Sequence, residues 1–468
     1  MLDLIRQNEK KIQLAFKISY LVLAISTFNS FLFTSPLQSF FVKICLGLGI
    51  IAIISRGLVM KQYLKTAYWK YLLCFMASYL ISSLLNAKYG LVDNLKWLVW
   101  MGLCFGLLYM YDSERKVSEY KKEFSLVSHI LMIYSLLASL ISLWMLLARY
   151  ANFLYLSDGT VVKAGYFWGR LWGVYTDPNY GAVYSVAVIV LTLYFCKVAK
   201  NLYLKVFYWI TVLFNCLYIV FSDSRTARIA MFVGIGFFMF AFFWEMFHLQ
   251  TVKRIGAAVV SAVVVVVLLN GAMNLTKQMY RKNIYPYMKE HHLGGGDGYD
   301  KVGVTSEELA EEREKDKKTD ISNRRFDLWG SGFEVWKTAP LFGTGYVTFG
   351  DYALEKVPET YAVNNDYGVF ANTHNQYINI LVFQGAVGFL ILVLFIKKVL
   401  KRIFERVFTY EGEDLYYIVT LISVVAIVAV AMLFVLEGIY TNSVGVFLLW
   451  FLLGLALQFV DSKERQKK

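Results

Sequence analysis

The sequence predicts an all-α polytopic membrane protein with about twelve transmembrane helices and one large, partly helical external loop between the ninth and the tenth. Hydrophobic residues make up 58% of the 468 residues and aromatic residues 17%, and the mean hydropathy is +0.50. A soluble chain of this length needs a polar surface that this composition cannot supply. Apolar runs of about 18 to 22 residues recur along the chain, each long enough to cross the hydrocarbon core as a helix.

The apolar runs also predict the topology. They lie at 14–33, 38–55, 69–86, 95–111, 126–148, 180–197, 205–221, 227–246, 255–272, 377–396, 416–436 and 442–460. The N-terminal segment and every second connection are rich in Lys and Arg, which mark the cytoplasmic side. Both termini are therefore expected in the cytoplasm, with the protein in the cell (plasma or inner) membrane. The first run is read as a retained helix, because no small-residue cleavage site follows it.

Four regions follow from this pattern. They are the first five helices (1–148), helices six to nine with their external turns (149–272), the large external loop (273–376), and helices ten to twelve with a cytoplasmic tail (377–468). Within the loop, Thr305 and Glu308 match a capping box and predict a charged, solvated helix to Lys318. After Ile321, an aromatic and apolar pattern predicts an amphipathic helix on the membrane surface.

Charge and cysteine usage exclude several classes of function. The formal net charge of +13 is explained by basic cytoplasmic connections that face anionic lipid, so no nucleic-acid partner is expected. All five cysteines fall within apolar runs, which favours core residues over disulfides or metal ligands. The external pair Asp297 and Asp300 lacks zinc-type ligands, so neither a metal nor another cofactor is expected.

A transporter, such as a flippase of lipid-linked sugars, is the alternative from another class. Transporters place substrate sites at broken helices, whereas all five prolines here fall in predicted external segments, so unbroken spans are expected. Lys17 lies near the cytoplasmic end of its span, where it can snorkel. Lys43 lies about two turns from the outer face, where it either snorkels or serves a function.

Two external turns carry arginines. Arg170 precedes the turn Asp177-Pro178-Asn179 and either anchors the loop among headgroups or contacts an anionic lipid substrate. Arg225 and Arg228 follow the capping residues 222–224 and share one face of the next helix. Cations there oppose the helix dipole, whereas two guanidinium groups beside unpaired N–H groups suit a diphosphate.

His374 stands immediately before the tenth span, where Asn372 or Thr373 can cap the helix. It is the one histidine fixed at the predicted external surface. One interpretation is a capping or interfacial histidine. The other is a general base, because a helix N-terminus disfavours the protonated imidazole, and the external arginines favour this second interpretation.

Four sequence pieces, in this order, resemble the O-antigen ligase and O-antigen polymerase family, which are membrane glycosyltransferases of the C-type architecture. They are GRLWGVYTDPN at 169–179, SDSRTA at 222–227, RRFDLW with APLFGTG within 324–345, and HNQYINILVFQGAVG at 374–388. The resemblance covers about residues 160–400. The stretch 290–320 departs from the family pattern as an insertion.

The resemblance implies an inverting, metal-independent transfer of a glycan from undecaprenyl diphosphate to a sugar hydroxyl. His374 matches the family's base, and Arg225 with Arg324 or Arg325 match the arginines that bind the diphosphate. The spacing to Trp329 favours Arg325. Further candidate ligands are Arg170 and Arg228. The implied partners are the undecaprenyl-diphosphate-linked oligosaccharide, an acceptor glycan, the lipid bilayer, a flippase and a chain-length regulator.

Polymerase and ligase differ in their acceptor, which is a second lipid-linked repeat unit or a sugar of the lipid A core. The residue usage, rich in Lys, Asn, Tyr and Phe, resembles that of low-GC bacteria, many of which lack an outer membrane. This usage favours a polymerase of capsular or O-antigen-like surface polysaccharide. An O-antigen ligase is the alternative.

Overall fold

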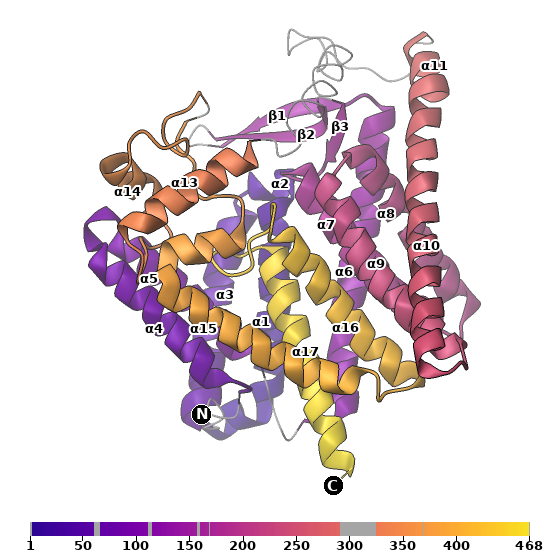
Figure 1. Cartoon of the computed structure of the whole chain (residues 1–468), viewed down its shortest axis with the longest axis horizontal. Helices are drawn as coiled ribbons and strands as arrows, with labels where there is room; N and C mark the ends of the chain where they lie inside the picture. Colours follow the sequence, from indigo (N-terminus) through magenta and orange to yellow (C-terminus); the bar gives the residue numbers. More distant parts are fainter. Residues whose placement is uncertain are drawn as a thin grey trace.

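The computed structural model describes residues 2–59, 66–110, 115–156, 160–167, 169–290, 324–366 and 368–467. The chain forms a bundle of long helices (Figure 1), and eleven described helices are long and apolar enough to cross a membrane. The remaining predicted span is the shorter apolar helix α4 (Trp69–Leu85). Each of the twelve predicted spans falls largely on a described helix, and the all-α polytopic class is confirmed.

Several helices extend well beyond the apolar runs, since α1 begins at Leu2, α6 begins at Val117 and α15 ends at Val407. The other long helices are α1 (Leu2–Phe28), α3 (Leu37–Ile54), α5 (Leu91–Leu103), α6 (Val117–Leu147), α7 (Pro178–Val198), α8 (Leu202–Ser222), α9 (Arg225–Met246), α10 (Thr251–Met279), α15 (Gln376–Val407), α16 (Gly412–Ala431) and α17 (Val444–Lys467). The short helices are α2 (Ser30–Phe33), α11 (Tyr285–Glu290), α13 (Arg325–Thr338) and α14 (Phe349–Lys356). Single π-helical turns extend α3 (Ser55–Val59), α5 (Cys104–Leu108) and α10 (Tyr280–Ile284).

The bundle has two distinct ends. Both chain termini lie at one end, which we call the terminal end, and the strands, α13 and α14 lie at the other, which we call the sheet end (Figure 1). Helices α7, α16 and α17 are largely buried within the bundle, whereas α3 and α10 expose most of their apolar side chains. Those exposed helices are suited to face lipid.

A three-stranded antiparallel sheet, which the sequence patterns did not indicate, lies at the sheet end. Its strands are β1 (Ala151–Tyr155), β2 (Val161–Phe167) and β3 (Arg170–Gly173), in the order β1-β2-β3. The sheet packs closely on α6, because a Cβ added at Gly173 (φ +63) would lie 2.0 Å from the Ser142 hydroxyl. That hydroxyl also accepts a hydrogen bond from the Val174 N–H at 3.1 Å. The contact fixes β3, and with it Arg170, on the helical bundle.

The large loop begins later than expected. The predicted span 255–272 belongs to α10, which runs to Met279 and continues through a π-helical turn and α11 to Glu290. The helix expected after Ile321 is present as α13, which packs on α15 and buries Leu328 and Val335. The charged helix expected at 305–318, together with the pair at 297 and 300, lies outside the described residues.

The expectation of unbroken spans is wrong for α15. Gly385 interrupts this helix with φ +66 and ψ −171. The loop 340–345 satisfies the backbone groups that the break leaves unpaired: Thr344 N–H donates to Val382 O at 2.9 Å, and Ala386 N–H donates to Pro340 O at 2.8 Å. Glycine produces this break without proline, so the positions of the prolines carry no argument against a transporter.

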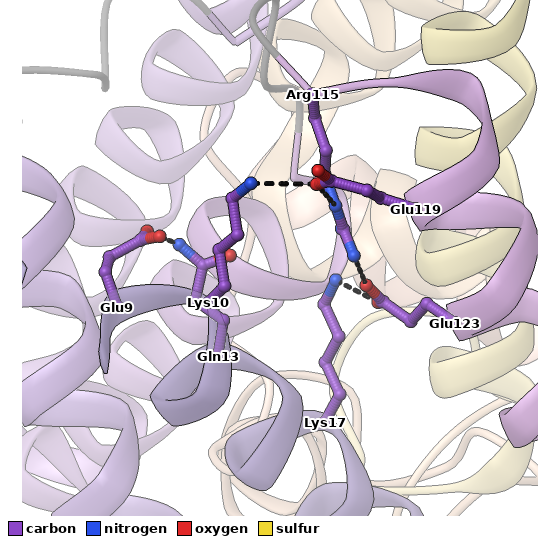
Figure 2. Close-up of polar contacts among 7 residues, drawn as sticks. All are labelled: Glu9, Lys10, Gln13, Lys17, Arg115, Glu119 and Glu123. Carbon is purple, nitrogen blue, oxygen red and sulfur yellow. Dashed lines mark hydrogen bonds and ion pairs between the residues drawn. The ribbon is translucent and has the colours of Figure 1, made fainter. Parts of the chain in front are cut away.

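A buried charged cluster joins α1 to α6 near the terminal end, and it corrects the prediction for Lys17. The Lys17 and Glu123 side chains form an ion pair and are only 3% and 4% exposed. Arg115 pairs with the other oxygen of Glu123, so one carboxylate holds two cations (Figure 2). Lys17 therefore does not snorkel, because a buried partner is available. Lys43, in contrast, is exposed on α3, as snorkelling requires.

Candidate functional site

Arg170 connects three segments at the sheet end. From β3, its Nε donates to Ser222 O at 2.7 Å at the end of α8, and its Nη2 donates to Asn179 Oδ1 at 2.7 Å in the first turn of α7. Burial lowers the pKa of the guanidinium, while the negative charges of Asp177 and Asp223 oppose that shift. This geometry indicates that Arg170 links segments of the protein to one another rather than anchoring the loop among lipid headgroups.

The turn between α8 and α9 is held from both sides. Ser224 caps α9 by accepting a hydrogen bond from Ala227 N–H at 3.2 Å, as the capping signals predict. Asp223 adopts a left-handed backbone (φ +52) and pairs with Lys277 of α10 at 2.6 Å. The turn is therefore anchored to α10 as well as to Arg170.

The two arginines that follow this turn differ in their surroundings. Arg225 is the first residue of α9 and is exposed, and its charge lowers the pKa of Arg170. Arg228 is half-buried, and its Nη1 donates to Asn274 Oδ1 at 2.8 Å. Of the two, Arg225 is better suited to meet a ligand from outside.

Arg324 and Arg325 also differ. Arg324 is the exposed residue before α13, in a left-handed conformation (φ +60). Arg325 is half-buried, and its guanidinium carbon lies 5.9 Å from the centre of the Phe434 ring, in the connection between α16 and α17. Among the described groups, Arg325 is the arginine whose charge lowers the pKa of His374.

His374 adopts a left-handed backbone (φ +51) just before α15. Its N–H donates to Asn372 Oδ1 at 2.8 Å, and its ring meets Phe370 edge-on at 6.2 Å between centroids. The side chain reaches solvent, yet the protein around it desolvates the imidazole. This partial desolvation lowers its pKa, the charge of Arg325 lowers it further, and Asp177 opposes both. The imidazole is therefore neutral at pH 7 and can accept a proton.

Asp177 connects the two halves of the site electrostatically. It caps α7, as the Asp-Pro-Asn turn predicts, and its negative charge acts on both Arg170 and His374. Arg225 acts on Arg170, and Arg325 acts on His374. Segments far apart in the sequence thus lie near enough at the sheet end for their charges to act on one another, and together they form the candidate site.

The cap of α15 differs from the prediction. Asn375, rather than Asn372 or Thr373, accepts the hydrogen bond of Tyr377 N–H, at 3.0 Å. The Thr373 hydroxyl instead donates to Asn379 Oδ1 at 2.7 Å. Asn372 is thereby available to bind the backbone of His374 and a second partner.

The loop 340–345 packs on α15 through a glycine on each side. A Cβ added at Gly343 (φ +72) would lie 2.3 Å from Val382 O, and one added at Gly385 would lie 2.2 Å from Leu341 O. Glycine is therefore needed on both sides of the contact. The contact holds the segment after α13 against α15, and so limits how far Arg325 and His374 can separate.

The sequence patterns did not indicate Glu437, which the structure brings to this site. Its Oε1 accepts a hydrogen bond from Asn372 Nδ2 at 2.8 Å, and burial raises the pKa of its carboxyl to about 7. A signal was available, because Glu437 is the one charged residue in the connection 432–443. A single carboxylate in an apolar turn is costly to bury and calls for a reason.

The fold defines a polytopic membrane protein, and its candidate arginines and histidine lie at one end of a helical bundle. A model of the O-antigen ligase family matches residues 210–393, from α8 into α15. Over this segment, the resemblance to the O-antigen ligase and polymerase family is confirmed. The matched segment includes Arg225, Arg325 and His374, whereas Arg170 precedes it.

A relative from Haemophilus influenzae, described as an uncharacterized protein, is 31% identical over 83 residues. The alignment covers 18% of this chain and 21% of that protein. The chain thus matches about a fifth of the relative's length, and the match carries no information about substrate.

Proposed function

We propose that the chain is a membrane glycosyltransferase that polymerises a bacterial surface polysaccharide, such as a capsule or an O-antigen-like chain. It transfers a glycan from undecaprenyl diphosphate to a sugar hydroxyl of another lipid-linked repeat unit, at the outer or periplasmic face. The observation that carries the proposal is the placement of His374 in a left-handed turn before α15, where the charges of Arg325 and Asp177 both act on it. Asp177 also acts on Arg170, on which the charge of Arg225 acts as well.

In this mechanism His374 is the base. The acceptor hydroxyl passes its proton to the neutral imidazole while its oxygen attacks the anomeric carbon of the donor sugar. The bond from that carbon to the diphosphate breaks, and the diphosphate leaves with the electron pair. Arg225 and Arg325 bind the diphosphate and stabilise its growing charge. Attack from the side opposite the leaving group inverts the anomeric configuration, and no step needs a metal.

The remaining arginines have supporting roles in this proposal. Arg170 and Arg228 already donate to Ser222 and Asn274, so they hold the turns that form the pocket and add positive charge. Arg324 is exposed next to Arg325 and attracts the anionic carrier. A flippase that delivers repeat units and a chain-length regulator are the proposed protein partners.

A ligase that transfers a finished glycan to lipid A core is the second candidate, because the matching family model is described as a ligase. A strain that lacks the gene distinguishes the two activities. A glycan ladder that collapses to single repeats on the carrier supports the polymerase. Intact long chains left unattached to lipid A support the ligase.

The decisive experiment supplies lipid-linked repeat units to the purified protein in detergent. Because transport needs two compartments and transfer does not, product formation excludes a pure flippase. His374→Ala is expected to lower transfer by about 10²- to 10⁴-fold, the usual contribution of a general base, with carrier binding unchanged. His248→Ala, at an exposed position in the connection between α9 and α10, is the matched control. Near-normal transfer by His374→Ala overturns the proposed mechanism.

A further inference from the structure

A chain of side-chain contacts runs from the α16–α17 connection to the proposed base. Glu437 Oε1 accepts from Asn372 Nδ2 at 2.8 Å, and Asn372 Oδ1 accepts from the backbone N–H of His374 at 2.8 Å. The Asn372 amide is thereby oriented at both of its ends. The left-handed backbone of His374 is uncommon for a residue with a side chain, so it depends on such support.

The carboxyl of Glu437 lies among neutral groups. The titratable side chains on which its charge acts are Tyr180 from α7, Tyr346 from the loop before α14, and Tyr440 from its own connection. Burial raises the pKa of Tyr346 and Tyr440 further above the ordinary value, so both stay neutral. Burial raises the pKa of the Glu437 carboxyl, and among the described residues no Lys or Arg opposes this rise. The Thr441 hydroxyl offsets it only in part.

The second carboxylate oxygen of Glu437 is less well satisfied than the first. Oε2 of Glu437 is buried and makes no hydrogen bond of good geometry with the described residues. A buried carboxylate with one of its two oxygens poorly satisfied is unfavourable for stability alone. Stability therefore does not account for an acid at this position, which a neutral side chain would fill at lower cost.

We infer that Glu437 is a positioning residue of the transfer site, which acts through Asn372 to hold the turn that carries His374. The inference rests on the proposed function, since it assigns Glu437 to the same reaction. Glu437 touches neither the imidazole nor, in this role, the substrate. Its effect is on the orientation of the base.

The protonation state of Glu437 sets the strength of its hydrogen bond with Asn372. An ionised carboxylate accepts the amide hydrogen bond more strongly than a protonated carboxyl does. Because burial raises the pKa of Glu437 to about 7, the stronger form is present above that pH and is lost as the pH falls through it. Transfer is therefore expected to slow in this range, at a higher pH than protonation of His374 alone would cause.

The experiment follows kcat/KM for transfer by the purified full-length protein across the pH range in which Glu and His titrate. The wild type is expected to lose activity towards acid in two steps, with the upper step near pH 7. Glu437→Gln retains a neutral acceptor for Asn372, so it should lose the upper step. Above that step it should be slower by roughly five- to tenfold, as expected when a neutral hydrogen bond replaces a charge-assisted one.

Two further variants separate positioning from general damage. Asn372→Ala should abolish the upper step of the pH profile by itself. In the double variant it should slow transfer little beyond Glu437→Gln, because both substitutions remove the same contact. It also tests the inference if Glu437→Gln folds poorly. Glu359→Gln is the matched control. Glu359 also accepts a hydrogen bond from an asparagine, Asn364 Nδ2 at 3.3 Å, but in an exposed loop. This variant should keep the pH profile of the wild type.

The outcomes are distinguishable. A Glu437→Gln or Asn372→Ala variant that keeps the two-step profile and the wild-type rate overturns this inference and leaves the proposed function standing. A His374→Ala variant that retains transfer overturns the proposed function itself, whatever Glu437→Gln does.

Discussion

The Nε of Arg170 lies 2.7 Å from the carbonyl oxygen of Ser222, and this one hydrogen bond joins the sheet to the turn that presents Arg225. A second bond, from Nη2 to Asn179, adds the first turn of α7. The sequence indicated Arg170 as an anchor or a ligand. In the structure it is first of all a link between β3 and the turn that carries Arg225, beside the hydrogen bond from the Tyr218 hydroxyl of α8 to Trp172 O at 3.1 Å.

Arg225→Ala is expected to weaken binding of the lipid carrier more than Arg228→Ala does. Loss of a charge-assisted phosphate contact costs about 1.5–3 kcal/mol, which raises Kd by roughly 10- to 150-fold. Arg228 already donates to Asn274, so its removal should mainly lower the Tm. Binding of a labelled undecaprenyl diphosphate to each detergent-solubilised variant measures the difference. Equal losses of affinity would contradict the assignment.

Arg325→Gln is expected to shift the acid limb of the pH profile upward. The charge of Arg325 lowers the pKa of His374, so its removal lets the imidazole take up a proton at higher pH. The base form then persists over a narrower range. The comparison is best made in the Glu437→Gln background, where the titration of His374 stands alone. An acid limb that does not move would mean that Arg325 and His374 do not share the site.

Gly385→Ala is expected to destabilise the fold strongly. The backbone at Gly385 is of a type almost restricted to glycine, so strain alone costs on the order of 1–3 kcal/mol, and the new Cβ would lie 2.2 Å from Leu341 O. Gly47→Ala, where a Cβ meets nothing within 4 Å, is the matched control. Thermal unfolding in detergent measures both variants. A Gly385→Ala protein as stable as the control would show that the loop contact is dispensable.

Glu123→Ala is expected to destabilise the bundle by about 3–5 kcal/mol, because it leaves two buried cations without their shared carboxylate. Glu119→Ala, on the same helix but 37% exposed, removes the pair with Lys10 and the longer contact with Arg115 at 3.7 Å, and it leaves Glu123 to hold both cations. It should cost no more than about 1 kcal/mol. Unfolding in detergent at low and high salt tests the pair of variants. Similar losses for both would place the Glu123 cluster in contact with solvent.

The number and positions of the long helices could be predicted because a membrane demands long apolar runs and internally satisfied backbones. Local signals also located several site residues. Ser224 caps the helix that begins with Arg225 and Asp177 caps α7, and both caps follow from residue type alone.

Features that depend on distant partners could not be predicted. The break at Gly385 exists because loop 340–345 supplies its hydrogen bonds, and Lys17 is buried because Glu123 is opposite it on α6. Glu437 joined the site through Asn372, which no local pattern connects to it. The small sheet escaped prediction because its strands are short and gain their stability from α6.

The pairing of loop 340–345 with α15 has a consequence for sequence divergence. Its hydrogen bonds run between backbone atoms, and these do not depend on which side chains the participating residues carry. Selection on this part of the protein should therefore fall on Gly343, Gly345 and Gly385, which all have positive φ and no room for a Cβ. Exposed positions of the loop, such as Leu341, are freer to change. A saturation-mutagenesis screen for transfer should show intolerance at these three glycines and tolerance at Leu341.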